Sequence, residues 1–193
     1  MKIVQIDYGA GNVKNIQFAF ERFGYSPALS SDPDEIMNAD KVIFPGVGEA
    51  SNAMDKLRKS GLDVVIPRLT QPVLGICLGM QLLCDTSEEN VTQGLGIFDQ
   101  QVKRFSNAVK VPQIGWNSIH ELRTQLFDNV AENEFMYLVH SYYVPLCKET
   151  IAVSDYEVPY SAAIQKDNFY GVQFHPEKSS VAGEQILKNF LSL

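Results

Sequence analysis

Residues 71–81 read QPVLGICLGMQ, and the rest of the chain is best understood outward from this stretch. Residues 73–76 form a short apolar run, which is typical of a strand buried on both faces. Leu78, Gln81 and the leucines that follow them favour a helix. Cys77 is therefore predicted at a strand-to-helix junction, with one glycine two residues before it and another two residues after it.

This Gly-x-Cys-x-Gly pattern has the form of a nucleophile elbow in which sulfur replaces oxygen. A sharp turn that presents a side chain needs neighbours without Cβ atoms, because the backbone must fold close to itself. The N-terminal N–H groups and the dipole of the following helix favour a thiolate, and the same N–H groups can hold a developing oxyanion. On this pattern alone, the alternative is a buried structural cysteine in a tight connection.

Length and charge limit the class of protein. The 193 residues predict one α/β domain, residues 1–193, with a sizeable core. The net charge of -7 argues against nucleic acid as a partner, since a phosphate-backbone binder needs a basic face. We expect no membrane association, signal peptide or membrane span. Three cysteines without C-x-x-C spacing fit a reducing cytoplasm with neither structural disulfides nor a metal site.

The first half of the chain alternates predicted strands and helices. The predicted strands cover residues 2–6, 26–30, 41–44 and 73–76. One predicted helix follows residue 12, a short second helix begins near residue 33, and two more cover residues 49–59 and 62–69. This alternation predicts a mostly parallel twisted sheet with helices on both faces. Ligands bind such sheets at the carboxyl ends of strands, where residues 7–12, residues 45–48 and Cys77 are expected.

The second half is richer in short β runs, so we expect antiparallel additions to the sheet there. These runs cover residues 101–105, 135–142, 151–156, 161–165 and 170–174. Ser179 or Ser180 is expected to cap a final helix. Its inward face would carry Ile186, Leu187, Phe190 and Leu191.

A cysteine nucleophile needs a base, and the base needs a group that orients it. Among His120, His140 and His175, only His175 has an acid two residues away, Glu177, on the same side of an extended chain. Pro176 between them disfavours the α region for His175, so the pair is expected to stay extended. A Cys-His-Glu relay is thus geometrically possible. A satisfied structural histidine is the alternative for His140 and His175.

Several other stretches carry two interpretations each. Residues 45–48, PGVG, are either a plain turn or a backbone donor that faces Cys77. Gly9 and Gly11 match the first two glycines of the dinucleotide-binding motif, but Lys14 occupies the position of its third glycine, so the motif is incomplete.

Cys84 is expected on the helix that follows Cys77, as a packed apolar residue, and Cys147 has no evident base. Residues 87–89 are either a solvated acidic turn or a carboxylate site for an ammonium group. Trp116, the only tryptophan, is expected in the core, with a partner-facing anchor as the alternative.

Two motifs together resemble the class I, triad-type glutamine amidotransferases. Residues 75–81, GICLGMQ, resemble the nucleophile motif of that family, and residues 171–177, GVQFHPE, resemble its His-Pro-Glu motif. Residues 7–12, 45–48, 111–117 and 139–142 are similar to the glutaminase subunits of imidazole glycerol phosphate synthases. The resemblance covers essentially the whole chain and implies the class I glutamine amidotransferase fold.

The resemblance implies a role for each matching residue. Cys77 would attack the side-chain amide of glutamine, His175 would move the proton, and Glu177 would orient His175. The N–H of Leu78, with one from Val47 or Gly48, would stabilise the oxyanion before a glutamyl thioester forms and water hydrolyses it. The residues that would hold glutamine are Gly46, Gly48, Gln81, Glu89, His140, Ser141 and Tyr142. Glu89 would bind the α-ammonium group.

The resemblance also implies a partner and no cofactor or metal. Ammonia would pass to a (β/α)8-barrel synthase subunit in a heterodimer, which would make imidazole glycerol phosphate in histidine biosynthesis in the cytoplasm. Pro112, Trp116 and Asn117 would lie near the shared interface.

Small departures from the family pattern leave the acceptor open. Residues 113–114 read Gln-Ile where His-Met is more familiar, and residues 90–93 form an unusual polar loop. The same glutaminase chemistry could therefore feed another synthase, such as one that amidates surface sugars. A stand-alone thiol hydrolase or peptidase and a nucleotide-binding module are two further interpretations of the chain.

Overall fold

A mostly parallel sheet forms the first half of the computed structural model, which describes residues 1–9 and 13–193. Four parallel strands lie in the order β2 (Ala28–Ser30), β1 (Ile3–Ile6), β3 (Lys41–Gly46) and β4 (Val73–Cys77). Strands β1, β3 and β4 are buried along their whole length, because helices cover both faces of the sheet. The predicted α/β class is confirmed. The part of the loop formed by residues 10–12, including Gly11, lies outside the described residues.

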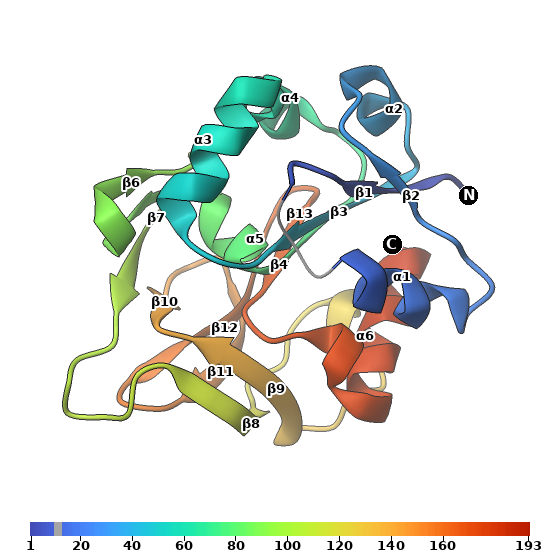
Figure 1. Cartoon of the computed structure of the whole chain (residues 1–193). Helices are drawn as coiled ribbons and strands as arrows, with labels where there is room; N and C mark the ends of the chain where they lie inside the picture. The colour runs from blue at the N-terminus through green and yellow to red at the C-terminus, as the bar shows by residue number, and fades with distance from the viewer. Residues whose placement is uncertain (10–12) are drawn as a thin grey trace.

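Helices pack against the sheet from two sides (Figure 1). One side carries α1 (Val13–Glu21) and α6 (Ser180–Ser192), and the other carries α2 (Pro33–Met37), α3 (Ala50–Ser60), α4 (Leu62–Val65) and α5 (Leu78–Leu82). Neighbouring residues of β1 show the alternation that this requires: Ile3 packs in the cluster of Phe20 and Phe190, and Val4 packs in the cluster of Leu57.

The second half extends the sheet with mostly antiparallel strands, as expected. Beyond β4, the order is β13 (Phe169–Val172), β12 (Pro159–Lys166), β10 (Tyr142–Pro145), β7 (Phe98–Arg104), β5 (Cys84–Ser87) and β6 (Thr92–Gln93), while β11 (Thr150–Asp155) pairs with β12. A separate antiparallel ribbon consists of β8 (Gln113–Ile119) and β9 (Glu134–His140) (Figure 1). Short 3-10 helices connect these elements: η1 (Ile66–Arg68), η2 (Glu89–Val91), η3 (Gln125–Phe127) and η4 (Pro176–Lys178).

Three sequence-based boundaries are wrong, and each has a local cause. The helix after Cys77 ends at Leu82, so Cys84 begins β5 and pairs with Phe98 of β7 instead of continuing the helix. Residues 62–69 divide into α4 and η1, because Pro67 lacks the N–H that would continue an α-helix. Residues 135–142 form two strands, since β9 pairs with β8 whereas β10 pairs with β7 and β12.

The final helix agrees with the sequence pattern in its core-facing residues, which are buried: Ile186, Leu187, Phe190 and Leu191. Ser179 occupies the N-cap position of α6, but its side chain makes no capping hydrogen bond there. Its hydroxyl instead donates to the carbonyl of His175 at 2.6 Å and accepts from the N–H of Tyr137 at 3.0 Å. Ser179 therefore ties the segment around His175 to β9. No helix among the described residues has the length and apolar character needed to cross a membrane.

Candidate active site

Cys77 is the last residue of β4, and helix α5 begins at the next residue. Its φ of 55° is uncommon for a residue with a side chain and marks the sharp turn of an elbow. A Cβ on Gly79 would lie 2.0 Å from the carbonyl oxygen of Phe44, and a Cβ on Gly75 would lie 2.9 Å from the N–H nitrogen of Met80. Both glycines of the pattern are therefore required by close backbone approach.

The end of β3 packs directly against this elbow. Gly46 is the register partner of Cys77, and a Cβ on Gly46 would lie 2.3 Å from the backbone nitrogen of Gly79. Val47 and Gly48 follow immediately, and Gly48 has a φ of 92°, which glycine adopts without strain. The predicted PGVG segment thus faces Cys77 and is more than a plain turn.

His175 and Glu177 form a buried pair. The Nδ1 of His175 lies 2.8 Å from Oε1 of Glu177, and both side chains are almost completely buried. His175 is extended, as Pro176 requires, but Glu177 lies in the 3-10 turn η4, so the expectation of a fully extended pair is wrong. The turn begins at Pro176, whose fixed φ suits the first helical position, and it brings the carboxylate back to the ring.

The surroundings of His175 favour its protonated form. Burial by itself lowers the pKa of His175, but hydrogen bonds and charges from Cys77 and Glu177 outweigh burial and raise the pKa from 6.5 to about 10. Because Nδ1 donates to Glu177, Nε2 is the ring nitrogen left to exchange a proton with Cys77. This arrangement supports a thiolate–imidazolium pair.

His140 has a different environment. Its Nδ1–H donates to the carbonyl of Tyr142 at 2.7 Å, and its Nε2 lies 3.4 Å from the hydroxyl of Tyr160. Burial lowers the pKa of His140 to about 4, although the bond to Tyr142 partly opposes this. His140 is therefore a neutral ring near neutral pH, and none of the carboxylates that the structure describes bonds it.

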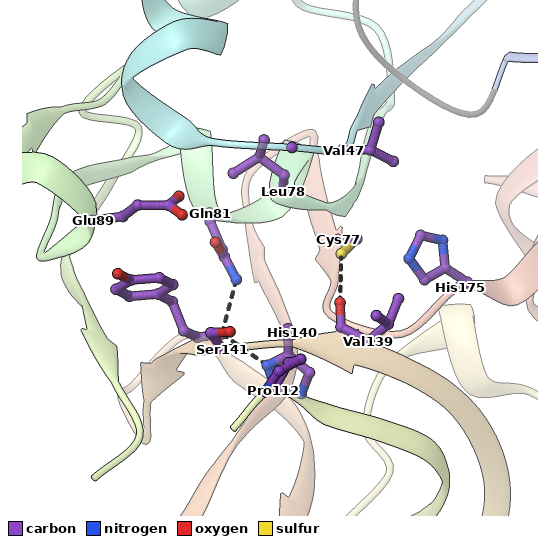
Figure 2. Close-up of a pocket in the computed structure, with 12 residues that line it drawn as sticks. Val47, Cys77, Leu78, Gln81, Glu89, Pro112, Val139, His140, Ser141 and His175 are labelled. Atoms are coloured by element: carbon purple, nitrogen blue, oxygen red, sulfur yellow. Dashed lines mark hydrogen bonds between the residues drawn. The ribbon is translucent and has the colours of Figure 1, made fainter. Parts of the chain in front are cut away.

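The predicted residues meet around one cavity of about 310 Å³ (Figure 2). Its lining includes Val47, Gly48, Cys77, Leu78, Gln81, Glu89, Pro112, His140, Ser141, Tyr142 and His175. Gly46 and Glu177 are absent from the lining: Gly46 lies behind the elbow and Glu177 lies behind His175. The space is large enough for an amino acid of the size of glutamine.

Glu89 contributes a carboxylate to the far wall of this cavity from Cys77 (Figure 2). Its Oε2 accepts a hydrogen bond of 2.8 Å from the N–H of Ala50 at the start of α3, which fixes the side chain. Burial raises the pKa of Glu89, and the bond from Ala50 counteracts that rise. A fixed, half-buried carboxylate in this position can bind a ligand's ammonium group.

The predicted interface residues divide into two groups. Pro112 lines the cavity, whereas Trp116 and Asn117 lie outside it on β8. Trp116 is 53% exposed and packs edge-on against Tyr137, so the expectation that it lies in the core is wrong. Asn117 donates to the carbonyl of Asp155 at 2.7 Å. Strand β8 thus presents Trp116 to solvent.

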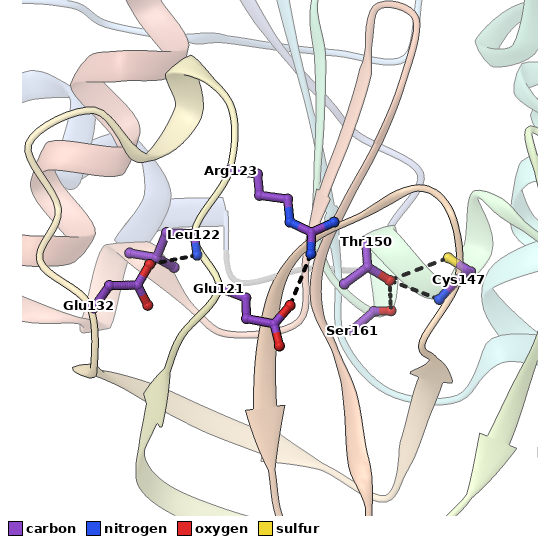
Figure 3. A network of polar contacts seen from close by, with 7 residues as sticks. All are labelled: Glu121, Leu122, Arg123, Glu132, Cys147, Thr150 and Ser161. Carbon is purple, nitrogen blue, oxygen red and sulfur yellow. Dashed lines mark hydrogen bonds and ion pairs between the residues drawn. The ribbon is translucent and has the colours of Figure 1, made fainter.

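The other two cysteines lie away from the cavity, and all three thiols are free. Cys84 is fully buried, as predicted, and burial raises the pKa of its thiol. Cys147 lies in a turn in which its backbone N–H donates a hydrogen bond of 2.9 Å to the hydroxyl of Thr150. The same hydroxyl also forms a hydrogen bond of 2.7 Å with the hydroxyl of Ser161 (Figure 3). This network explains Cys147 as a structural residue.

Sequence patterns missed two residues that contact Cys77 and one that supports the neighbouring PGVG segment. The carbonyl of Val139 and the side-chain nitrogen of Gln173 each lie 3.8 Å from the sulfur, and Tyr8 supports the PGVG segment through a bond to Pro45. Gln173 lies inside the 171–177 motif, which was a signal that could have found it. The contact of Val139 uses only its backbone, so its side-chain type carried no such signal. Among the described residues, no group of three or more His, Cys, Asp or Glu residues could hold a metal ion.

Comparisons with known proteins agree on one family. The family model described as "Glutamine amidotransferase class-I" matches residues 4–193. "Imidazole glycerol phosphate synthase subunit HisH" of Bacteroides fragilis (strain YCH46) is 54% identical over 196 residues, and that of Escherichia coli (strain K12) is 46% identical over 196 residues. Each of these alignments covers 100% of both chains.

Solved structures support the fold at low sequence identity. The structure of PurLQS from Thermotoga maritima has a TM-score of 0.74 at 15% identity, covering 99% of this chain and 97% of its own. A glutamine amidotransferase from the same organism has a TM-score of 0.66 at 18% identity, covering 100% of this chain and 83% of its own.

Proposed function

Because the chain belongs to the class-I glutamine amidotransferases, we propose that Cys77, His175 and Glu177 hydrolyse glutamine to glutamate and ammonia. Its full-length similarity to HisH subunits makes it the glutamine amidotransferase subunit of an imidazole glycerol phosphate synthase, an enzyme of histidine biosynthesis. One observation carries the residue assignment: Cys77 stands on a positive-φ elbow beside His175, whose other ring nitrogen bonds Glu177 at 2.8 Å. We treat residues 1–193 as a single glutaminase domain.

The first half of the reaction forms a thioester. The proton of Cys77 moves to Nε2 of His175, and the thiolate attacks the side-chain amide carbon of glutamine. The carbonyl electrons move to oxygen, and the N–H of Leu78, with one from Val47 or Gly48, stabilises that oxyanion. His175 then gives its proton to the amide nitrogen, the C–N bond breaks, and ammonia leaves.

The second half releases glutamate. Water attacks the thioester while His175 takes its proton, and a second oxyanion forms in the same place. Its collapse breaks the C–S bond, and the proton returns from His175 to the sulfur. Glu177 keeps Nδ1 protonated throughout, so the same ring nitrogen serves as base and acid in turn.

The other cavity residues hold the amino-acid part of the substrate. We assign the α-ammonium group to Glu89, which is the carboxylate of the lining and lies across the cavity from Cys77. The remaining contacts come from Gly48 on one side, and from Gln81, His140, Ser141 and Tyr142 on the other. Gly46, which was expected to hold glutamine, acts instead through the backbone that it packs against the elbow. These polar groups fix orientation, while the elbow supplies the chemistry.

The subunit name of the relatives implies a partner synthase subunit in a complex. We further propose that this partner is a (β/α)8-barrel, that the complex is a cytoplasmic heterodimer, and that Pro112, Trp116 and Asn117 lie at the interface. Ammonia in neutral water is mostly protonated and lost as a nucleophile. A partner that closes the mouth of the cavity would instead receive the neutral molecule.

Replacement of Cys77 tests this function. The complex of the Cys77→Ala chain with its synthase subunit should make product from ammonium salts but not from glutamine, because only the glutamine route needs the thioester. The Cys147→Ala complex is the matched control and should use both nitrogen sources. If the isolated wild-type chain hydrolyses glutamine as fast as the complex supplied with acceptor, a stand-alone thiol hydrolase is the better account.

A further inference from the structure

The sulfur of Cys77 lies between two groups of opposite hydrogen-bonding character. The side-chain nitrogen of Gln173 lies 3.8 Å from Sγ and can only donate, whereas the carbonyl oxygen of Val139 lies 3.8 Å from Sγ and can only accept. Gln173 follows β13 and is fully buried. The thioester chemistry of Cys77, His175 and Glu177 gives Gln173 no role, although its amide touches the reacting atom.

The orientation of the Gln173 amide follows from its neighbours. The carbonyl of Tyr142 can only accept, so the group of Gln81 that lies 2.9 Å from it is the Nε2 amide nitrogen (Figure 2). The same nitrogen donates to Oε1 of Gln173 at 2.9 Å. Because Oε1 of Gln173 accepts this bond from Gln81, the Nε2 of Gln173 must point toward Cys77. The hydrogen bonds thus distinguish the oxygen from the nitrogen of the Gln173 amide, which are nearly identical in shape.

We infer that Gln173 is a further catalytic residue, whose side-chain amide donates a hydrogen bond to the Cys77 thiolate while Gln81 fixes its orientation. The inference deepens the proposed function, because it rests on Cys77 as the nucleophile. Besides contacting glutamine, Gln81 then orients Gln173, because its Nε2 donates hydrogen bonds to the carbonyl of Tyr142 and to Oε1 of Gln173.

The two contacts of the sulfur favour different protonation states. In the thiol, the S–H bond can point to the carbonyl of Val139. When the S–H bond breaks and the proton moves to Nε2 of His175, the thiolate loses that donor role and becomes an acceptor for Gln173. The pair keeps its total charge, so no outside proton is needed. A donor aimed at a buried anion stabilises it more than the same donor would in water.

Alkylation of Cys77 by iodoacetamide, followed against pH without glutamine, tests the inference. In Gln173→Met the shape is similar but the donor is gone. The rate of Cys77 alkylation rises with pH as the thiolate forms, and the midpoint of this rise should shift upward by about one pH unit. Below the midpoint, alkylation should then be roughly tenfold slower than in the wild type. Cys147 serves as an internal reference. Gln165→Met is the matched control, because the Gln165 amide bonds Tyr170 at 3.1 Å, and its midpoint should stay that of the wild type.

A second variant separates donation from packing. Gln81→Met leaves Gln173 in place but frees its amide to turn, so the midpoint should rise by less than in Gln173→Met. An unchanged midpoint in folded Gln173→Met overturns the inference, and if that variant does not fold, an unchanged midpoint in Gln81→Met overturns it. If the midpoint rises as expected but the wild-type complex does not hydrolyse glutamine, the amide contact is upheld and the proposed function fails.

Discussion

The hydroxyl of Tyr8 donates a hydrogen bond of 2.9 Å to the carbonyl of Pro45, and this bond joins the end of β1 to the segment that borders Cys77. Tyr8 is buried, its ring packs on Phe44 at 5.7 Å, and burial raises the pKa of its hydroxyl, so it remains a donor. Pro45 directly precedes Gly46, the register partner of Cys77. Tyr8 therefore positions the PGVG segment without lining the cavity.

Tyr8→Phe should weaken both the fold and glutamine hydrolysis. The change keeps the ring but leaves the carbonyl of Pro45 without this donor, which costs about 1–2 kcal/mol of unfolding free energy. We expect kcat for glutamine to fall several-fold because the segment after Pro45 is held less firmly. Urea denaturation and steady-state kinetics measure the two effects. Tyr156→Phe, which removes an exposed bond to the carbonyl of Lys110, should change both much less, and equal effects would reject the positioning role.

An electrophilic glutamine analogue should label only Cys77. Cys77 is the thiol in the cavity, Cys84 is fully buried, and Cys147 belongs to a turn outside the cavity. Peptide mapping after partial reaction measures the distribution of label. Excess glutamine should slow labelling of Cys77 and leave any slow background on Cys147 unchanged. Label found chiefly on Cys84 would refute the nucleophile assignment.

The two cavity histidines should give different kinetic defects. His175→Ala removes the proposed base and should lower kcat by about 10²–10⁴-fold. His140→Ala removes a neutral ring of the cavity wall and should act more on KM for glutamine. Glu177→Gln, which keeps the shape but removes the negative charge of the carboxylate, should lower kcat by less than His175→Ala does. A deeper kcat loss in His140→Ala than in His175→Ala would reverse the roles.

His140 should make the protein sensitive to acid. Its pKa is about 4 in the folded chain and 6.5 as the ordinary value, so between these values the unfolded chain binds a proton that the folded chain excludes. Stability is therefore lost as pH falls from 6.5 to 4, by up to roughly 3 kcal/mol. His140→Asn can replace the Nδ1–H donor and does not titrate. Urea midpoints of this variant should fall less steeply over that window, and parallel curves would contradict the assignment.

Trp116→Ala should uncouple the two reactions. Trp116 is large, 53% exposed and set on β8, so its loss should weaken contact with the synthase subunit and leave the Cys77 cavity intact. The measurement is the amount of glutamine consumed per product formed, which should rise. Val64→Ala, a similarly exposed residue on α4, is the control. Unchanged coupling in Trp116→Ala would place the partner elsewhere.

Local chemistry was enough to predict the elbow. The apolar run of β4, the glycines at positions 75 and 79 and the start of a helix after Cys77 are set by sterics over a few residues, and the structure contains all three. The Asp32 cap of α2 and the inward face of α6 follow from equally local rules. The His-Pro-Glu motif predicted that His175 and Glu177 lie within reach of each other, but they meet through the 3-10 turn that begins at Pro176 and not through the extended chain that was expected.

Tertiary structure decided the features that depend on distant partners. The helix after Cys77 stops at Leu82 because β7 pairs with Cys84, and residues 113–119 become a strand because β9 lies beside them. The bond of Tyr8 to Pro45 spans 37 residues, and the contact of Gln173 with Cys77 spans 96. A sequence pattern records which groups a residue carries. Which of several distant donors and acceptors it meets is fixed only when the sheet order brings β1, β3, β4 and β13 together and β9 packs beside them.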